Sequence, residues 1–185
     1  MGVKQLLDFT GRVALITGGS RGLGLQIATA LGEMGAQLAL TARKADELEH
    51  AVAHLAKQGI RASAFVCDAS QRDHIPETVD AVLNTFGKVD ILVNNAGATW
   101  GAPAEDHPLE GWDKLMNVNL TGAFIFAQQA AKKSMIPGHW GRIINTASIA
   151  GLIASDPRFV KTVAYNATKH GVIGLTRQLA AEWGV

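Results

Sequence analysis

The sequence predicts an α/β fold built on a doubly wound parallel sheet, and three observations lead to that prediction. Short apolar segments alternate with longer segments of helical periodicity along the whole chain. The apolar segments show little of the polar–apolar alternation that marks a strand with one solvent-facing side, so they are expected to be buried on both faces. Finally, 185 residues with 48% hydrophobic content are enough for one domain with a substantial core.

The predicted strands are short runs rich in Val, Ile and Leu. The first is Val-Ala-Leu-Ile-Thr at residues 13–17, and the fourth is Val-Asp-Ile-Leu-Val at residues 89–93. Apolar runs this short between turn residues suit a strand better than a helix. In chain order, we predict strands at residues 13–17, 38–41, 62–67, 89–93 and 142–145.

The segments between the strands have the periodicity of helices. In the second of them, Leu48, Val52 and Leu55 fall on one face, and charged or polar residues occupy the other. Gly35 and Gly59 follow the first two segments and are typical of helix ends. We predict helices at residues 23–34, 45–58, 72–86, 109–133 and 163–183. Helices that alternate with strands in this way form right-handed crossovers between parallel strands.

The chain ends directly after its last predicted helix, which carries Tyr165 and Lys169. A parallel sheet normally continues from such a helix into another strand. We therefore expect a single domain over residues 1–185 that lacks its C-terminal part after this helix.

The composition excludes several classes of protein. Lys and Arg number 17 against 16 Asp and Glu, without a basic run, which argues against nucleic acid or an anionic membrane as partner. No apolar run reaches the roughly 18 residues of a membrane span, and the start of the chain has no apolar leader. The single cysteine, Cys67, excludes a disulfide framework. These features predict a soluble cytoplasmic protein.

No metal site is predicted. His50 and His54 lie one helical turn apart, but both fall on the polar face of their helix without a third ligand. We interpret them as solvated surface residues.

A glycine-rich loop joins the first predicted strand to its helix. Glycines permit a tight turn, let the backbone approach a pyrophosphate and let the helix pack closely on the strand. The start of the helix adds free N–H groups and a positive dipole end. The alternative is an ordinary glycine-rich turn, but its place between strand and helix favours a Rossmann-like dinucleotide site. The predicted cofactor contacts in this loop are Gly18, Ser20, Arg21, Gly22, Leu23 and Gly24.

The charge after the second strand predicts NADP(H) rather than NAD(H). Dinucleotide folds specific for NAD place an acid there for the ribose 2′-hydroxyl, but this chain has Thr-Ala-Arg-Lys at residues 41–44. Arg43, together with Arg21 of the loop, suits a dianionic 2′-phosphate. The alternative is that both arginines are solvated helix-end residues.

Several motifs in order along the chain resemble those of the short-chain dehydrogenase/reductase family. They are the G-x-x-x-G-x-G spacing of residues 18–24, Asn-Asn-Ala-Gly at residues 94–97 and Tyr-x-x-x-Lys at residues 165–169. The resemblance extends from about residue 11 to residue 185. It is strongest to single-domain members such as 3-oxoacyl-carrier-protein reductases and gluconate 5-dehydrogenases.

The resemblance implies further cofactor contacts. Asp68 would face the adenine amino group, although a turn or helix-capping aspartate is the alternative. The backbone of residues 94–97 would line the cofactor ribose. The additional cofactor residues that we predict are Ala69, Asn95, Ala96 and Gly97.

Tyr165 and Lys169 are four residues apart in a predicted helix and therefore lie on one face. A free tyrosine has a pKa of about 10, so a tyrosine that acts as a base near neutrality needs a neighbouring cation. An ammonium about 4 Å away supplies roughly 4 kcal/mol at an effective dielectric constant near 20, which is enough in scale. The resemblance implies that Tyr165 is the general acid/base and that Lys169 also binds the nicotinamide ribose.

Two more catalytic residues follow from the resemblance. Ser148 would orient the substrate oxygen, and Asn119 would hold a water molecule in a proton relay. Alternatively, Ser148 is a turn residue and Asn119 a buried hydrogen-bonding residue. Tyr165 follows Ser148 by 17 positions, four more than in most family members. The extra residues fall within 152–163, which puts the register of Ser148 in question and is expected to shape one wall of the substrate pocket.

The sequence therefore predicts an oxidoreductase that transfers a hydride between NADP(H) and a ketone or secondary alcohol. One alternative is a non-catalytic dinucleotide-binding sensor or scaffold of the same fold. Another is a nucleotide-sugar epimerase or dehydratase. We also expect a homo-oligomer, a dimer or tetramer, with the helices at 109–133 and 163–183 as the interface. Small residues would allow those helices to approach closely, namely Ala127, Ala130, Ala167 and Gly171.

Overall fold

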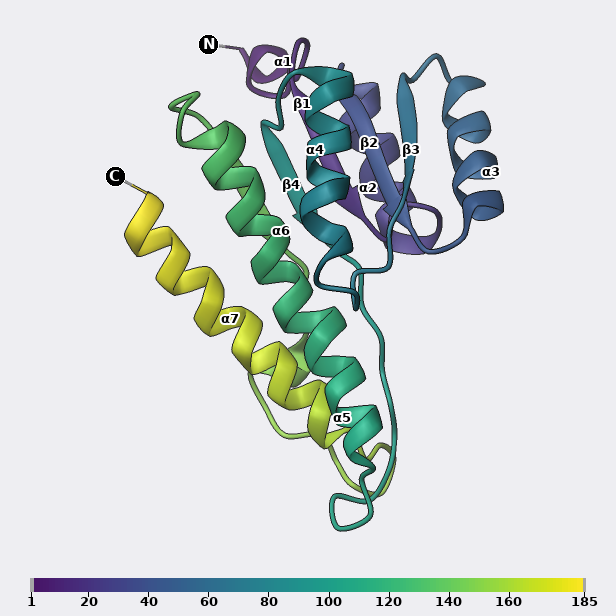
Figure 1. Ribbon diagram of the computed structural model, residues 1–185, viewed down its shortest axis with the longest axis vertical. Helices are drawn as coiled ribbons and strands as arrows, with labels where there is room; N and C mark the ends of the chain where they lie inside the picture. The colour runs from purple at the N-terminus through teal and green to yellow at the C-terminus, as the bar shows by residue number, and fades with distance from the viewer. Residues whose placement is uncertain (1, 185) are drawn as a thin grey trace.

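The computed structural model describes residues 2–184 and contains a five-stranded parallel sheet of order β3-β2-β1-β4-β5 (Figure 1). The first and last residues, Met1 and Val185, lie outside the described residues. The predictions about an N-terminal leader and about a missing C-terminal part rest partly on these two residues. The strands are β1 Val13–Thr17, β2 Gln37–Ala42, β3 Ala62–Val66, β4 Ile91–Asn94 and β5 Arg142–Asn145. The order runs outward from β1 in both directions, so the predicted doubly wound sheet is confirmed.

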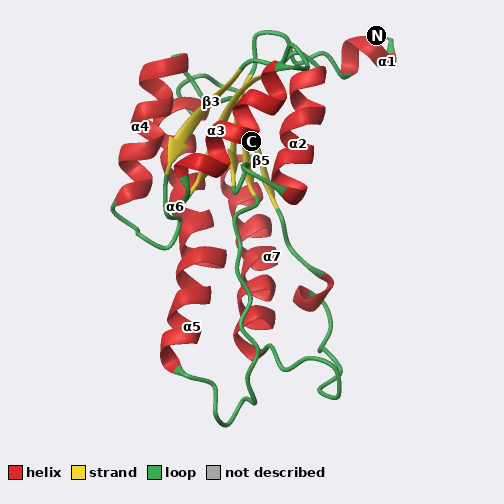
Figure 2. Ribbon diagram, turned by 90° about the vertical axis from the view of Figure 1, so that its right-hand side faces the viewer, coloured by secondary structure: helices red, strands yellow, loops and turns green. Residues whose placement is uncertain are grey.

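The helices match the predicted periodic segments, with ends moved by a few residues. A four-residue helix, α1, at Val3–Leu6 was not predicted. The long helices are α2 Gly22–Glu33, α3 Ala45–Ala56, α4 His74–Phe86, α5 Leu109–Leu115, α6 Gly122–Ala130 and α7 Val163–Trp183. In Figures 1 and 2, α5 and the first turns of α7 extend together beyond the sheet.

Two hydrophobic clusters cover the two faces of the sheet. Leu15 of β1 packs in one cluster with apolar residues of α4, α6 and α7. Its neighbours Ala14 and Ile16 point the other way and pack with residues of α2 and α3. Alternate residues of one strand therefore serve opposite cores, which is why the strand sequence shows no alternation.

Burial on both faces holds for the central strands and not for the edges. All residues of β1 and β4 are buried, whereas Val66 of β3 is 60% exposed and Ile144 of β5 is 50% exposed. The prediction was wrong for β3 and β5 because each has a strand neighbour on one side only within the described residues. Their place in the strand order is set by the fold and is not encoded in local composition.

The helix predicted at 109–133 is interrupted twice. A π-helical turn at Met116–Thr121 separates α5 from α6, and a second one at Ala131–Met135 follows α6. Each π turn accommodates an extra residue, a feature common at functional positions. The first turn contains Asn119, and the second contains Ser134.

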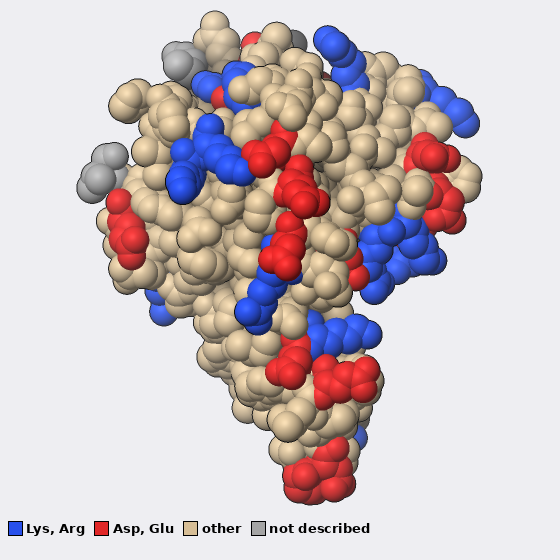
Figure 3. All heavy atoms as spheres, viewed as in Figure 1, with Lys and Arg blue, Asp and Glu red and all other residues tan. Residues whose placement is uncertain are grey.

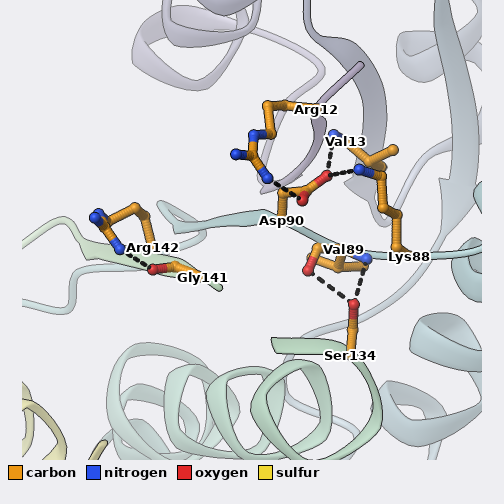
Figure 4. Close-up of polar contacts among 8 residues, drawn as sticks. All are labelled: Arg12, Val13, Lys88, Val89, Asp90, Ser134, Gly141 and Arg142. Carbon is orange, nitrogen blue, oxygen red and sulfur yellow. Dashed lines mark hydrogen bonds and ion pairs between the residues drawn. The ribbon is translucent and has the colours of Figure 1, made fainter. Parts of the chain in front are cut away.

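Ser134 also explains why β4 begins later than predicted. Its hydroxyl oxygen accepts a hydrogen bond from Val89 N at 2.8 Å and donates to Val89 O at 3.0 Å (Figure 4). Both backbone groups of Val89 are thus engaged by a side chain of the helical layer. The strand consequently starts at Ile91.

Asp90 joins the starts of β1 and β4 at the end of the sheet opposite the glycine loop. The residue is 6% exposed, and its carboxylate accepts hydrogen bonds from the backbone N–H of Val13 at 2.8 Å and from the Arg12 guanidinium (Figure 4). The carboxylate also forms an ion pair with Lys88 at 2.9 Å. Burial raises the pKa of Asp90, but the bonds from Val13, Lys88 and Arg12 outweigh it, and the pKa lies below its usual value. An ionised Asp90 therefore fixes the pairing of the two central strands.

Two of the small residues expected at an oligomer interface lie inside the protein. Ala127 and Ala130 are 1% and 0% exposed and belong to the core between α6 and the sheet. A Cβ at Gly171 would lie 2.8 Å from Leu120, so Gly171 serves packing within the chain. Only Ala167 of the four is exposed. The expected use of Ala127, Ala130 and Gly171 was wrong because the helical periodicity does not say which face the rest of the chain covers.

Basic and acidic side chains are interspersed over the face shown in Figure 3, in line with the net charge of +1. Among the described residues, none of the helices has the length and apolar character that crossing a membrane requires.

Candidate active site

The carboxyl ends of three adjacent strands, β1, β4 and β5, bring the predicted motifs together. The glycine loop follows Thr17, residues 94–97 begin at the last residue of β4, and Ser148 follows β5 by three residues. In open α/β sheets, ligands bind at this edge, where the strand order changes direction.

The glycine loop folds back on the first turn of α2 so closely that side chains are excluded. A Cβ at Gly24 would collide with the carbonyl oxygen of Gly18. Gly18 and Gly22 have φ values of +65° and +55°, which side-chain-bearing residues rarely adopt. Since no side chain caps α2 at Arg21, the N–H groups of its first turn remain free to bind an anion. This cradle fits a dinucleotide pyrophosphate.

Thr17 ties the glycine loop to the segment after β4. Its hydroxyl oxygen accepts hydrogen bonds from Asn95 N and Ala96 N, both at 3.0 Å. In return, Asn95 Nδ2 donates to Thr17 O at 3.1 Å and to Gly18 O at 3.3 Å. Thr17 was not among the predicted site residues; the available signal was a hydroxyl at the end of an otherwise apolar strand.

Tyr165 and Lys169 lie on one face of α7, as predicted. Lys169 Nζ is 5.7 Å from the centroid of the Tyr165 ring and donates a hydrogen bond of 2.6 Å to Thr146 O. Lys169 is 5% exposed, and burial lowers its pKa. The structure thus holds a buried ammonium beside the Tyr165 ring.

Ser148 lies directly beside α7. Its hydroxyl oxygen accepts a hydrogen bond of 3.2 Å from Ala150 N and so caps a 3₁₀ turn at Ile149–Gly151. A Cβ at Gly151 would be 2.6 Å from Lys169 O, which shows how closely the turn packs on α7. The segment 152–162 follows this contact as a loop, and its end pairs with residue 102 through the bridge Ala102–Thr162.

Asn119 connects the segment after β4 to α7. The residue is 2% exposed, its Oδ1 accepts from Ala98 N at 2.8 Å, and its Nδ2 donates to Ala98 O at 2.9 Å and Thr168 Oγ1 at 3.1 Å. Thr168 in turn donates to Tyr165 O at 2.8 Å. Both Nδ2 hydrogens and one of the two Oδ1 acceptor sites of Asn119 are thus engaged within the chain.

Asp68 and Ala69 follow β3 at the same edge of the sheet. Asp68 Oδ1 accepts hydrogen bonds from Ser70 N at 2.9 Å and Ser70 Oγ at 2.7 Å, which is the turn geometry of the alternative interpretation. Burial raises the pKa of Asp68, but these bonds and the charges of Arg43 and His74 outweigh it and lower the pKa. Gly122 lets this loop approach α6, since a Cβ there would be 2.5 Å from Ala69 O.

The basic residues predicted for the 2′-phosphate differ in their contacts. Arg43 is exposed and has no ion-pair partner in the described part of the chain. Arg21 is paired with Glu47 of α3 at 3.8 Å, and Lys44 pairs with the same carboxylate at 3.0 Å. Glu47 was not predicted as a site residue, although an acid three positions after Lys44 at a helix start was visible in the sequence.

No metal site was predicted, and residues 2–184 contain no group of three or more potential metal ligands.

Comparison with known proteins gives close matches. A profile described as short chain dehydrogenase matches residues 12–185. A D-threitol dehydrogenase of Mycolicibacterium smegmatis is 40% identical over 174 residues, which cover 94% of this chain and 65% of that protein. A gluconate 5-dehydrogenase of Gluconobacter oxydans is 36% identical over 184 residues, covering 100% of this chain and 70% of the relative. The chain thus spans about two thirds of the length of these curated relatives.

Solved structures agree over nearly the whole chain. A short-chain type dehydrogenase/reductase from Mycobacterium marinum superposes with a TM-score of 0.94 at 37% identity, covering 100% of this chain and 74% of that one. An NAD⁺-bound xylitol dehydrogenase gives 0.89 at 36% identity, with coverages of 95% and 66%. A metagenomic short-chain oxidoreductase in complex with NADP gives 0.87 at 37% identity, with coverages of 94% and 76%.

Proposed function

This chain belongs to the short-chain dehydrogenase/reductase family, and from that premise we propose that it transfers a hydride between NADP(H) and a ketone or secondary alcohol. The family resemblance seen in the motifs is confirmed by the matches. The observation that carries the proposal is the buried Lys169 ammonium, held by Thr146 and lying 5.7 Å from the Tyr165 ring centroid.

The cofactor cradle is assigned to groups at the carboxyl ends of β1 to β4. The backbone of Gly18 to Gly24 would hold the pyrophosphate, with the free N–H groups of α2 directed at its charge. Asp68 and Ala69 would lie against the adenine, and Asn95, Ala96 and Gly97 would line the ribose. When bound, the nicotinamide supplies a hydride to a carbonyl carbon or accepts one from an alcohol carbon.

NADP(H) is preferred in this proposal because of charge. Arg21 and Arg43 flank the position after β2, and Ala42 ends that strand without an acid. Arginine binds a phosphate dianion through paired N–H donors. The solved relatives include one with NAD⁺ and one with NADP, so the family accommodates both cofactors.

Tyr165 is the proposed general acid/base. In reduction its phenol donates a proton to the substrate oxygen, and in oxidation its phenolate accepts the hydroxyl proton. The buried Lys169 ammonium is the cation that this role requires near the phenol, since its Nζ lies 5.7 Å from the centroid of the Tyr165 ring.

Ser148 and Asn119 are assigned supporting roles. Ser148 uses its oxygen to accept from Ala150 N, which leaves its hydroxyl proton free for the substrate oxygen. Asn119 holds Ala98 and Thr168 in place, and its backbone lies in the π-helical turn, where it would contact the relay water.

The direct test measures absorbance of the reduced nicotinamide with NADPH or NADH and a panel of ketones that includes keto sugar acids and 3-oxoacyl thioesters. Turnover with any member, faster with NADPH, is the expected result. Tight binding of the cofactor with no turnover across the panel would instead favour the non-catalytic sensor or scaffold. If neither cofactor bound saturably, the oxidoreductase proposal and the sensor or scaffold alternative would both be excluded.

We further propose a cytoplasmic homo-oligomer, a dimer or tetramer, that acts on small molecules and does not bind nucleic acid. The single cysteine and the mixed surface charge support this assignment. Light scattering of the purified chain measures the oligomeric state, and a strictly monomeric mass would contradict it.

A further inference from the structure

Glu47 reaches from the start of α3 into the glycine loop and contacts three of its polar neighbours. Ser20 Oγ donates to Glu47 Oε2 at 3.3 Å, and Arg21 Nε lies 3.8 Å from the same oxygen. Lys44 Nζ lies 3.0 Å from Oε1. The side chain of Glu47 is 26% exposed, whereas those of Arg21 and Lys44 are 78% and 65% exposed.

Stabilisation of α3 alone does not account for these contacts. An acid in the first turn of a helix is favourable, and both Asp46 and Glu47 occupy that turn. Only Glu47 is in contact with the glycine loop, 27 residues away in the sequence. Asp46 therefore offers a matched comparison: it has the same charge in the same helical turn but no described contact with the loop.

The groups that contact Glu47 are hydrogen-bond donors and cations, which are the groups that would bind the 2′-phosphate of NADP(H). Ser20 is a hydroxyl donor, and Arg21 and Lys44 are cations that contact the same carboxylate as Ser20. A carboxylate and a phosphate carry the same sign of charge and accept the same donors. The two anions therefore compete for one set of donors.

We propose that Glu47 is a specificity-determining residue that weakens binding of NADP(H) relative to NAD(H) by occupying the donors of the 2′-phosphate. This inference rests on the proposed function, which it deepens. A 2′-phosphate must displace the carboxylate from Arg21 and Lys44, and it also meets the repulsion of Glu47. A free 2′-hydroxyl carries no charge and requires no such displacement.

Arg43 acts in the opposite direction to Glu47. It is exposed, and although its charge acts on Asp68, none of the ion pairs among the described residues includes it or joins it to Glu47. The preference of the protein is thus set by two opposed features: Arg43 favours the phosphate, and Glu47 holds the remaining cations away from it.

The experiment titrates the unmodified chain, Glu47→Gln and Asp46→Asn with adenosine 2′,5′-bisphosphate and with adenosine 5′-diphosphate, by calorimetry. The pairs involved are partly exposed, so the expected effect is modest: Glu47→Gln binds the 2′,5′-bisphosphate about two- to tenfold more tightly. Its affinity for adenosine 5′-diphosphate changes by less than about twofold. Asp46→Asn leaves both affinities within about twofold, because Asp46 is not paired with Arg21 or Lys44.

Three outcomes would overturn the inference: unchanged affinity of Glu47→Gln for the 2′,5′-bisphosphate, an equal gain for both nucleotides, or an equal gain in Asp46→Asn. Titration of the unmodified chain with NADPH and NADH distinguishes failure of the inference about Glu47 from failure of the proposed function. Binding of NADPH without an effect of Glu47→Gln would remove the inference alone. Absence of binding by NADPH and NADH would remove the proposed function and the inference with it.

Discussion

Lys169 Nζ donates a 2.6 Å hydrogen bond to the carbonyl oxygen of Thr146, 23 residues earlier in the chain. This bond joins α7 to the segment after β5, two residues before Ser148. The ammonium is buried, and none of the ion pairs in the described part of the chain includes it. Its position is therefore set by a neutral oxygen, and no carboxylate among the described residues neutralises its charge beside the Tyr165 ring.

Replacing Tyr165 with Phe removes only the phenolic oxygen. We expect turnover to fall by about 10²- to 10⁴-fold, the usual contribution of a positioned acid/base, while the Kd for NADPH changes little. Absorbance assays and fluorescence titration measure the two quantities. Gln178→Ala, an exposed change on the same helix, should leave both unchanged. Full turnover by Tyr165→Phe would remove the assigned role.

Lys169 should make stability depend on pH. Burial lowers its pKa below the 10.5 of a free lysine, so the unfolded chain binds more protons than the folded one between the two values. Stability should therefore rise with pH across this window, and Lys169→Met should lose that rise. Urea denaturation of both forms from about pH 8 to pH 10.5 measures it, in a Tyr165→Phe background so that the phenol does not contribute. Parallel profiles for the two forms would contradict the expectation.

Asp90→Asn should destabilise the protein by about 2 kcal/mol at neutral pH, because it removes the charge that Arg12 and Lys88 share at a buried position. The pKa of Asp90 is depressed in the folded state, so this contribution is complete above about pH 4 and is lost as the pH falls through the folded value. The difference in urea midpoint between the two forms should thus shrink in acid. Asp80→Asn, which breaks the more exposed pair with Lys133, should cost no more than about 1 kcal/mol.

Gly24→Ala should abolish NADPH binding, since its Cβ would collide with the carbonyl oxygen of Gly18 and force the loop apart. Gly174→Ala provides the control. Gly174 lies in α7 with nothing within 4 Å of an added Cβ, so alanine should stabilise the helix by up to about 1 kcal/mol and leave binding intact. Thermal melts and NADPH titration report both effects. Wild-type affinity in Gly24→Ala would show that the loop does not hold the pyrophosphate.

Arg43→Asp should raise the KM for NADP at least about tenfold more than that for NAD, because it places a carboxylate opposite the 2′-phosphate and gives the 2′-hydroxyl an acceptor. Arg61→Asp, an equal charge reversal at the start of β3, should leave the ratio unchanged. An unaltered ratio in Arg43→Asp would remove the NADP assignment.

The sequence was a good guide where local pattern decides structure. Strand β5 begins and ends as predicted, and α7 does too, since apolar runs and glycine stops report directly on these elements. The meeting of the glycine loop, the segment after β4 and Ser148 at one edge also followed, because parallel strands place their carboxyl ends together.

Features that depend on tertiary packing were not visible in the sequence. The contacts of Glu47 arise between two helix starts, and an acid in a first helical turn is too common to single out. The π turns were missed because one additional residue barely alters an apolar repeat. The burial of Ala127 and Ala130 depends on which side of α6 faces the sheet.

The π-helical turn at Met116–Thr121 accommodates one extra residue between α5 and α6. Because the extra residue is confined to one turn, α5 before it and α6 after it keep regular α-helical geometry. The orientation of Asn119 is thereby uncoupled from the packing of α6. Asn119 can therefore keep its hydrogen bonds to Ala98 and Thr168 while α6 keeps its place in the core against the sheet.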